Sequence, residues 1–400
     1  MIKLTLRRNL IYPLQYLMWT VLRDLETILI SYFFEIDYFS IYTLLMFLGE
    51  LLAGLIIYLY QNQFSSNNKT GKIPKFLPLE YTKTEYNFVK DSKFKIIFLI
   101  FTIGFYDFIQ FILTFPVSQS LMISGSFERR LRGTFTITTA LFYYFVLGLP
   151  IFKHQFFSLV AIGICILIVI ITELFFQEFN IYLTYGEFFL YLLFIFLIQF
   201  NWSFEQLIEK YLFEYNQLNP FFVLMIEGIF GIIFCFIYSF FISPFDEIIQ
   251  FKNDNSTSKF VILIVLLILY VVFSGFKNSF RVITTKIYSP TTSTFIEYIF
   301  NPIYLIFYFL SGDDFISYSG KVNYAQFIIN LIISLIMTFL GSVYNELLVL
   351  FCCGLERDTH IQVIKRSDEE KKLNDRKYSE VESILSDYLI PMKNINQLNE

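Results

Sequence analysis

The sequence has few charged residues and very little histidine. Asp, Glu, Lys and Arg make up 16% of the 400 residues, against roughly 25% in soluble domains. The two histidines, His154 and His360, stand far apart in the chain. No metal-ligand cluster, Gly-x-Ser-x-Gly elbow or paired His-acid motif is visible. We therefore expect no enzyme, no metal site and no cofactor.

The chain also lacks a disulfide framework and a nucleic-acid-binding patch. Of the four cysteines, Cys165 and Cys235 lie in apolar runs, whereas Cys352 and Cys353 lie at the end of a predicted helix. This arrangement does not resemble the even spacing of a disulfide-stapled domain. The lysine-rich segment 61–95 is the main basic stretch, and it is more simply a loop facing lipid headgroups. Nucleic-acid binding has no support.

What is abundant is apolar sequence in long runs. Hydrophobic residues make up 56% of the chain, and the runs match the length of about 20 residues that a helix needs to cross a bilayer. We predict an all-α polytopic membrane protein, with a membrane domain over 1–350 and a cytosolic tail over 351–400. The ten predicted spans are 9–34, 38–60, 95–115, 118–149, 155–175, 187–208, 220–243, 260–282, 290–311 and 325–350.

The first span carries an unusual load of charge. Arg23, Asp24 and Glu26 lie inside it, and each costs about 2.5–3.5 kcal/mol at the centre of a membrane helix. Either neighbouring helices shield these side chains or the segment lies along the membrane surface. We favour a crossing.

The positive charges indicate an orientation. With ten crossings and a cytosolic N-terminus, most Lys and Arg residues fall on the cytosolic side. The opposite side then holds only Lys252, Lys259 and Lys321. The positive-inside rule therefore predicts that both termini are cytosolic.

Four charges interrupt the fourth span: Glu128, Arg129, Arg130 and Arg132. Facing lipid, they would cost on the order of 10 kcal/mol. In one continuous helix, Glu128, Arg129 and Arg132 share an arc that Thr136 continues. Arg130 points away and needs a separate partner. The cluster either lines a cavity or only ties helices together, and we favour a cavity wall.

Further ionisable residues lie at bilayer depth, where a functional or paired role is the usual explanation. They are Glu50, Asp107, Glu227, Lys286 and Glu297. In the ninth span, Ser293, Glu297 and Asn301 share one face, and Pro302 then removes a backbone donor. Interrupted helices near the membrane midplane are how carriers expose backbone groups to substrate.

A faint internal repeat joins the second and seventh spans. Gly49-Glu50 lies in the second span and Glu227-Gly228 in the seventh. These spans correspond if the chain is two five-helix repeats, over 9–175 and 187–350. Because five is odd, such repeats must be inverted in the membrane, as in alternating-access carriers.

Several segments together resemble a known family. They are "MFLGE" at 46–50 with Asp107, "LRGTFTITTALFYYFVLGLPIFKHQFFSLVAIGICILIVI" at 131–170, "EKYLFEYNQLNPFFVLMIEGIFG" at 209–231, "TTKIYSPTTSTFIE" at 284–297 and "GSVYNELLVLFCCGLERDT" at 341–359. Over about 36–360 the chain resembles the drug/metabolite transporter superfamily with its EamA-like repeats. It looks like solute carrier family 35, subfamily F, of the sixth-member type, and chloroquine-resistance-type transporters are cousins.

The resemblance implies ten helices in two inverted repeats and transport of a small organic solute across an endomembrane (Golgi, lysosome or vacuole). Proton coupling follows by analogy with the cousins, and a homodimer is left open. The sequence also departs from the family. Arg129 and Arg130 stand where the family has uncharged residues, Ser293 stands where it has Arg, and Phe300-Asn301-Pro302 replaces a second basic position. By the resemblance, two cavity charges are expected to have moved from the ninth helix to the fourth, which would either alter substrate choice or mark a decayed copy.

The leading hypothesis is a carrier in the lipid bilayer whose partners are a small organic solute and protons. Its expected substrate-binding residues are Glu50, Asp107, Arg129, Arg132, Thr136, Glu227, Lys286, Ser293, Glu297 and Asn301. Arg129 and Arg132 would hold an anionic group or neutralise Glu297, and Glu297 or Glu227 would take the coupling proton. The alternative is a non-transporting relative that acts as a receptor or assembly partner.

Overall fold

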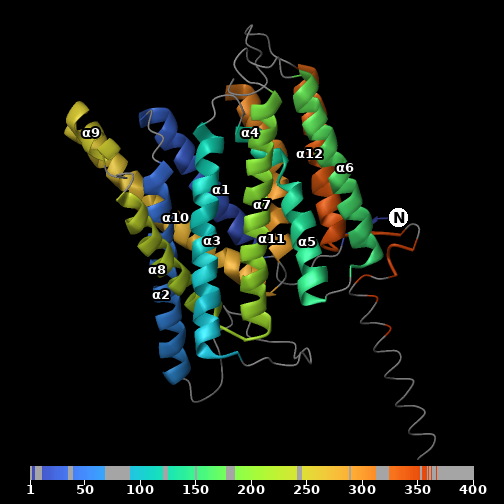
Figure 1. The fold of residues 1–400 in the computed structure, drawn as a ribbon, viewed down its shortest axis with the longest axis horizontal. Coiled ribbons are helices and arrows are strands. Elements are labelled where there is room, and N and C mark those ends of the chain that lie inside the picture. The colour runs from blue at the N-terminus through green and yellow to red at the C-terminus, as the bar shows by residue number, and fades with distance from the viewer. Residues whose placement is uncertain are drawn as a thin grey trace, which may run out of the picture.

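The protein is an all-α bundle of twelve described helices with one short β-ladder (Figure 1). The computed structural model describes residues 2–4, 11–34, 39–67, 91–119, 125–148, 151–176, 185–240, 246–287, 290–311, 324–351, 354–357, 359, 362 and 366. The helices are α1 (Ile11–Phe34), α2 (Phe39–Asn67), α3 (Lys93–Gln119), α4 (Gly125–Arg130), α5 (Gly133–Leu147), α6 (Lys153–Phe176), α7 (Tyr185–Glu214), α8 (Pro220–Ser239), α9 (Asp246–Asp254), α10 (Thr257–Ile287), α11 (Pro290–Ser311) and α12 (Tyr324–Tyr344). The strands are β1 (Ile2–Leu4) and β2 (Leu348–Leu350).

Six helices are long and apolar enough to cross a membrane: α2, α6, α7, α8, α10 and α12. Large apolar side chains cover their outer faces; Phe175, for example, is 82% exposed and Phe240 is 87% exposed. Water would disfavour such a surface, whereas lipid tails suit it. The chain is thus a polytopic all-α membrane protein, and α1, α3, α4 with α5, and α11 correspond to the other four predicted spans.

Two predicted spans need correction. The fourth was predicted as one helix over 118–149, but α3 continues to Gln119 and the next helical segment is divided into α4 and α5. The tenth was predicted to continue to 350, but α12 ends at Tyr344 and residues 348–350 form a strand. The short helix α9 was not predicted, because its charged sequence lacks an apolar run.

Helix α1 packs against α10 and α11. Tyr16, Thr20, Asp24 and Glu26 are all buried, and the ring of Trp19 stacks on that of Phe276 at 4.6 Å between centroids. Of the two alternatives for the charged first span, the packing matches shielding by neighbouring helices.

Glycines let α2 approach α8 and α10 closely. A Cβ atom added at Gly49 would lie 2.5 Å from the carbonyl oxygen of Val271, and one at Gly275 would lie 2.7 Å from the carbonyl oxygen of Gly49. On the α8 side, a Cβ at Gly228 would lie 2.6 Å from the backbone nitrogen of Leu51. Small residues at membrane helix interfaces permit this backbone contact. The same crossings bring the neighbouring residues Glu50 and Glu227 into the bundle interior.

The two strands connect the start of the chain to the end of α12. They pair antiparallel, with Ile2 opposite Leu350 and Leu4 opposite Leu348. Figure 1 accordingly shows the N-terminus beside the end of α12.

Candidate functional site

The division between α4 and α5 is a short stretch of tighter helix. The backbone nitrogen of Leu131 donates to the carbonyl of Glu128 at 3.1 Å, and that of Arg132 donates to the carbonyl of Arg129 at 3.3 Å. These bonds span three residues rather than four, as in a 3₁₀-helix. Gly133 follows the stretch, where a Cβ would lie 2.9 Å from the side chain of Ile162. The local change rotates the side chains before the stretch relative to those of α5.

Helix α11 supplies donors to the carbonyls at this break. The Asn301 amide donates to the carbonyl of Arg129 at 3.2 Å, and the Tyr298 hydroxyl donates to the carbonyl of Arg132 at 3.1 Å. The Tyr298 hydroxyl also bonds the hydroxyl of Thr136. Two of the predicted site residues, Thr136 and Asn301, therefore lie together where α4, α5 and α11 meet.

Helix α11 is itself interrupted at Pro302, which lies inside it. Proline has no backbone N–H, so the carbonyl of Tyr298, four residues earlier, loses its usual donor. The hydroxyl of Thr338 in α12 donates to that carbonyl at 2.9 Å instead. Two helices with altered hydrogen-bond ladders thus face each other.

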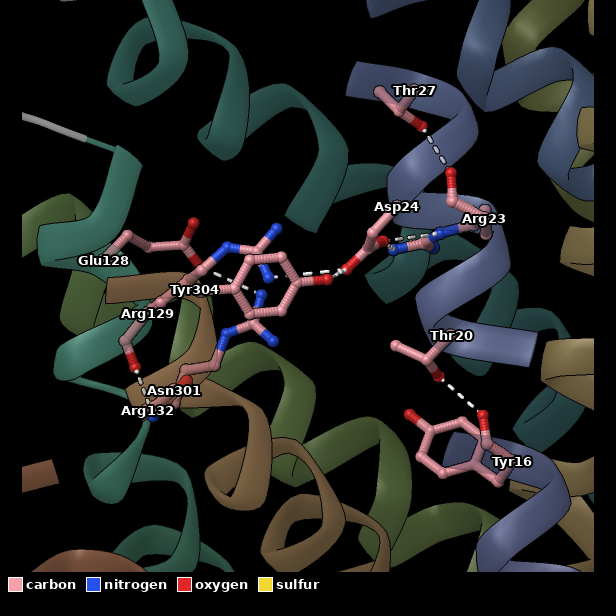
Figure 2. A network of polar contacts seen from close by, with 10 residues as sticks. All are labelled: Tyr16, Thr20, Arg23, Asp24, Thr27, Glu128, Arg129, Arg132, Asn301 and Tyr304. Atoms are coloured by element: carbon pink, nitrogen blue, oxygen red, sulfur yellow. Dashed lines mark hydrogen bonds and ion pairs between the residues drawn. The ribbon is translucent and has the colours of Figure 1, made fainter. Parts of the chain in front are cut away.

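A set of charged and aromatic side chains surrounds this meeting point, and we call it the arginine network: Arg23, Asp24, Glu128, Arg129, Arg132 and Tyr304. Figure 2 shows the guanidinium groups of Arg129 and Arg132 beside the ring of Tyr304, with Asp24 of α1 opposite. Arg129 Nη1 lies 3.4 Å from Asp24 Oδ2, and Arg23 Nη2 lies 2.7 Å from Asp24 Oδ1. The Tyr304 hydroxyl donates to Asp24.

The two predicted arginines of the network are held differently. The Arg129 guanidinium carbon lies 3.9 Å from the centre of the Tyr304 ring, which is close enough for a cation–π interaction. Arg132 Nη2 lies 3.9 Å from Glu128 Oε1, the expected pair one helical turn apart. Both arginine side chains keep about a fifth of their surface exposed, at 21% and 20%. Arg23 is equally exposed at 21%, and all three are more accessible than Arg130 at 2%.

Arg130 points elsewhere, as predicted. Its Nη1 lies 3.0 Å from Glu173 Oε2 of α6, and Gln326 of α12 donates to the same oxygen at 3.2 Å. The need for a separate partner is confirmed. The sequence did not identify the partner, because Glu173 lies near the end of an apolar run and resembles a residue at the end of a membrane span.

A second set lies among α2, α3, α7, α8 and α10, and we call it the acidic network: Glu50, Asp107, Glu205, Glu209, Glu227 and Arg281. Arg281 contacts Glu205 at 3.1 Å, Glu209 at 2.9 Å and Glu227 at 3.3 Å. Glu50 accepts a hydrogen bond from the Asn278 amide. All except Asp107 are buried.

The structure thus divides the predicted site residues into two networks. Glu50, Asp107 and Glu227 come together with carboxylate oxygens within 4.8 Å of one another. Arg129, Arg132, Thr136 and Asn301 come together at the α4–α5 break.

The other three predicted residues are not placed in either network. Lys286 donates to the carbonyl of Leu218 at 3.1 Å, near the start of α8. The side chains of Ser293 and Glu297 lie outside the described residues, so the pairing of an arginine with Glu297 stays a prediction.

Sequence reasoning missed five charged members of these networks. Arg23 and Asp24 were recognised only as a cost of insertion. Glu209 was missed because the sixth span was expected to end at 208, whereas α7 continues to Glu214, and Glu205 was overlooked inside that span. Arg281 was counted as a cytosolic charge, but it is 5% exposed. The available signal was the spacing of Glu205 and Glu209, one helical turn apart on the same face.

These features define a multi-pass membrane protein with ion-paired networks inside its helical bundle. No family model matches the sequence, and no curated protein matches it. One solved structure, described as "Crystal structure of protein", superposes with a TM-score of 0.49 at 10% sequence identity, covering 83% of this chain and 94% of that chain. At this level of similarity nothing about function follows.

Proposed function

We propose that the protein is a carrier that moves a small organic solute across an intracellular membrane by alternating access. One observation carries the proposal: the divided helix α4–α5 meets the proline-interrupted helix α11, and the arginine network lies at the meeting point. Carriers commonly bind substrate where discontinuous membrane helices expose backbone groups.

The charges of the arginine network favour a solute with an anionic group. Three of its members are cationic (Arg23, Arg129 and Arg132) and two are anionic (Asp24 and Glu128). Arg129 is held by Asp24 and by the ring of Tyr304. A carboxylate or phosphate on the solute would take the place of Asp24 beside Arg129, and guanidinium groups are well suited to such partners.

Two features agree with the inverted repeats and with the placement of both termini on one side of the membrane; the proposal that this side is cytosolic rests on the positive charges. Paired strands must lie on one side of a membrane, so the β1–β2 ladder requires an even number of crossings between them. Ten crossings satisfy this condition. The Gly49-Glu50 and Glu227-Gly228 dipeptides, which suggested the repeat, lie at the crossing of α2 and α8.

A transport assay on the full-length protein in proteoliposomes tests the proposal. We expect uptake from a panel of small organic anions, and we expect Arg132→Gln and Arg129→Gln to abolish it. Lys95→Gln is the matched control, because it removes a cation at the start of α3 that is 51% exposed. Loss of uptake in Arg129→Gln and Arg132→Gln, with normal uptake in Lys95→Gln, supports a carrier.

The same assay addresses the alternative of a receptor or assembly partner. Absence of flux for the whole panel, with the wild-type protein folded in the vesicles, would favour the non-transporting alternative. Normal flux in both arginine variants would leave a carrier but remove the arginine network as its binding site.

A further inference from the structure

The acidic network contains two carboxylate triads that share Glu227. In the first, Glu205, Glu209 and Glu227 bring oxygens within 4.8 Å of one another. The Arg281 guanidinium lies within 3.3 Å of an oxygen from each of these residues. This triad therefore has its own cation, supplied by the protein.

The second triad, Glu50, Asp107 and Glu227, has the same spacing. Among the described residues, no side-chain cation forms an ion pair with Glu50 or Asp107. Arg281 contacts Glu227 through Oε1. Glu50 Oε1 accepts from Asn278. Glu50 Oε2 and Glu227 Oε2 are buried without a hydrogen-bond partner in the described part of the chain, as is Glu205 Oε2 of the first triad.

Such oxygens are costly. The Glu50 and Glu227 side chains are 1% and 0% exposed, so water does not solvate them. A buried carboxylate oxygen without a partner loses its solvation and regains nothing, a loss of roughly 1–3 kcal/mol or more. The first triad has Arg281 to offset this cost, whereas the second has two such oxygens and no cation of its own among the described residues, which favours a bound cation there.

The net charge of the acidic network also favours a bound cation. The network has five carboxyl groups, Glu50, Asp107, Glu205, Glu209 and Glu227. The positive charges near these carboxyl groups are those of Arg281 and Lys277. Lys277 lies close enough to Glu50 for electrostatic interaction. Five negative charges against two positive charges leave three uncompensated. Carboxylates this close inside a bundle cannot all stay ionised without additional positive charge.

Asp107 is the solvent-accessible member of the second triad. Of its three members, Asp107 alone keeps part of its surface accessible, whereas the other two are fully buried. It lies in α3, across from the α2–α8 crossing that positions Glu50 and Glu227. An ion arriving at Asp107 would meet the two orphaned oxygens next.

We propose that Glu50, Asp107 and Glu227 form a binding site for one divalent metal ion. The ligand set is entirely oxygen, which suits hard ions such as Mg²⁺, Ca²⁺ and Mn²⁺ rather than soft ones. Glu227 links this site to Arg281, so filling it changes the charge next to the arginine-held triad. The site does not require that the protein transport a solute, and its test measures binding alone.

The experiment uses the purified full-length protein in lipid nanodiscs. Free Mn²⁺ is titrated, and its binding is followed by electron paramagnetic resonance. Glu50→Gln and Asp107→Asn are the test variants, the second guarding against misfolding of the first. Glu209→Gln is the matched control, because it removes a buried carboxylate from the triad that Arg281 already fills.

Each outcome is decisive. A metal site predicts Mn²⁺ binding that weakens by at least about tenfold in both test variants and persists in the control. The proposal is overturned if the wild-type protein does not bind Mn²⁺, or if Mn²⁺ binding survives both test substitutions. None of these outcomes depends on transport, so the carrier proposal stands or falls separately.

Discussion

The guanidinium of Arg130 and the carboxylate of Glu173 form an ion pair at 3.0 Å, and each side chain is 2% exposed. The pair connects α4 to α6, and Gln326 connects it to α12. The pair lies apart from the arginine network, which contains Arg129 and Arg132, the arginines on either side of Arg130 in the sequence. One short helix therefore directs neighbouring arginines to different partners.

Removing one member of this pair should destabilise the fold strongly. Glu173→Met leaves Arg130 buried without its counter-charge, and such losses cost about 3–5 kcal/mol. The double variant Arg130→Met with Glu173→Met should recover most of that loss, because apolar side chains of similar volume often replace buried pairs at little cost. Unfolding in mixed detergent micelles measures the free energy of unfolding of the single and the double variant. Equal destabilisation in the single and double variants would falsify the ion-pair explanation.

The close crossing of α2 with α8 and α10 predicts intolerance of larger residues. Gly228→Ala and Gly275→Ala each place a methyl group within 2.7 Å of a backbone atom of α2, and overpacking of this kind costs about 1–3 kcal/mol. Gly163→Ala is the control, since its nearest neighbour would be a side-chain atom at 3.8 Å. Thermal unfolding should show lower melting temperatures for the first two only. If Gly163→Ala destabilises as much, the backbone contact is not the cause.

The α4–α5 break depends on donors from α11. Tyr298→Phe removes the hydroxyl that bonds the carbonyl of Arg132 and the hydroxyl of Thr136. We expect a loss of about 1 kcal/mol and faster amide hydrogen exchange around Arg132, because the Arg132 carbonyl keeps only its bond from the backbone nitrogen of Phe135 and the Thr136 hydroxyl loses its bond to Tyr298. Tyr144→Phe, whose side chain is 50% exposed on α5, is the control. Unchanged exchange at the break in Tyr298→Phe would mean that α11 does not hold it.

A pH-dependent contact lies at the start of α3, outside the membrane-spanning segment. Hydrogen bonds from Lys95, Asn216 and Tyr211 hold the pKa of the Asp91 carboxyl below its usual value. A folded-state pKa below the unfolded value of about 3.9 means that the stabilisation is complete above that pH and is lost as the pH falls toward the folded pKa.

Asp91→Asn should therefore lower the melting temperature near neutral pH, and the difference from wild type should narrow as the solution is acidified below about pH 4. Melting curves of both proteins across the pH series check this. A constant difference at every pH would show that the Asp91 charge contributes nothing.

The membrane class and most helix positions followed from the sequence, because a bilayer demands long apolar segments whatever they pack against. The separate orientation of Arg130 also followed, since helical geometry sets which side chains share a face. The break after α4 did not. Nothing in the apolar pattern marks the 3₁₀ bonds at Leu131 and Arg132, because the carbonyls of Arg129 and Arg132 take donors from Asn301 and Tyr298 of a distant helix.

The sequence by itself thus determined that this chain buries ionisable groups inside a membrane bundle and that these groups need partners. Only the tertiary structure decided which partners they have. It placed Glu50, Asp107 and Glu227 together, paired Arg281 with Glu205 and Glu209, and separated both sets from Arg129 and Arg132. The reason is physical: the cost of a buried charge depends on its own helix, but its compensation comes from helices far away in the chain.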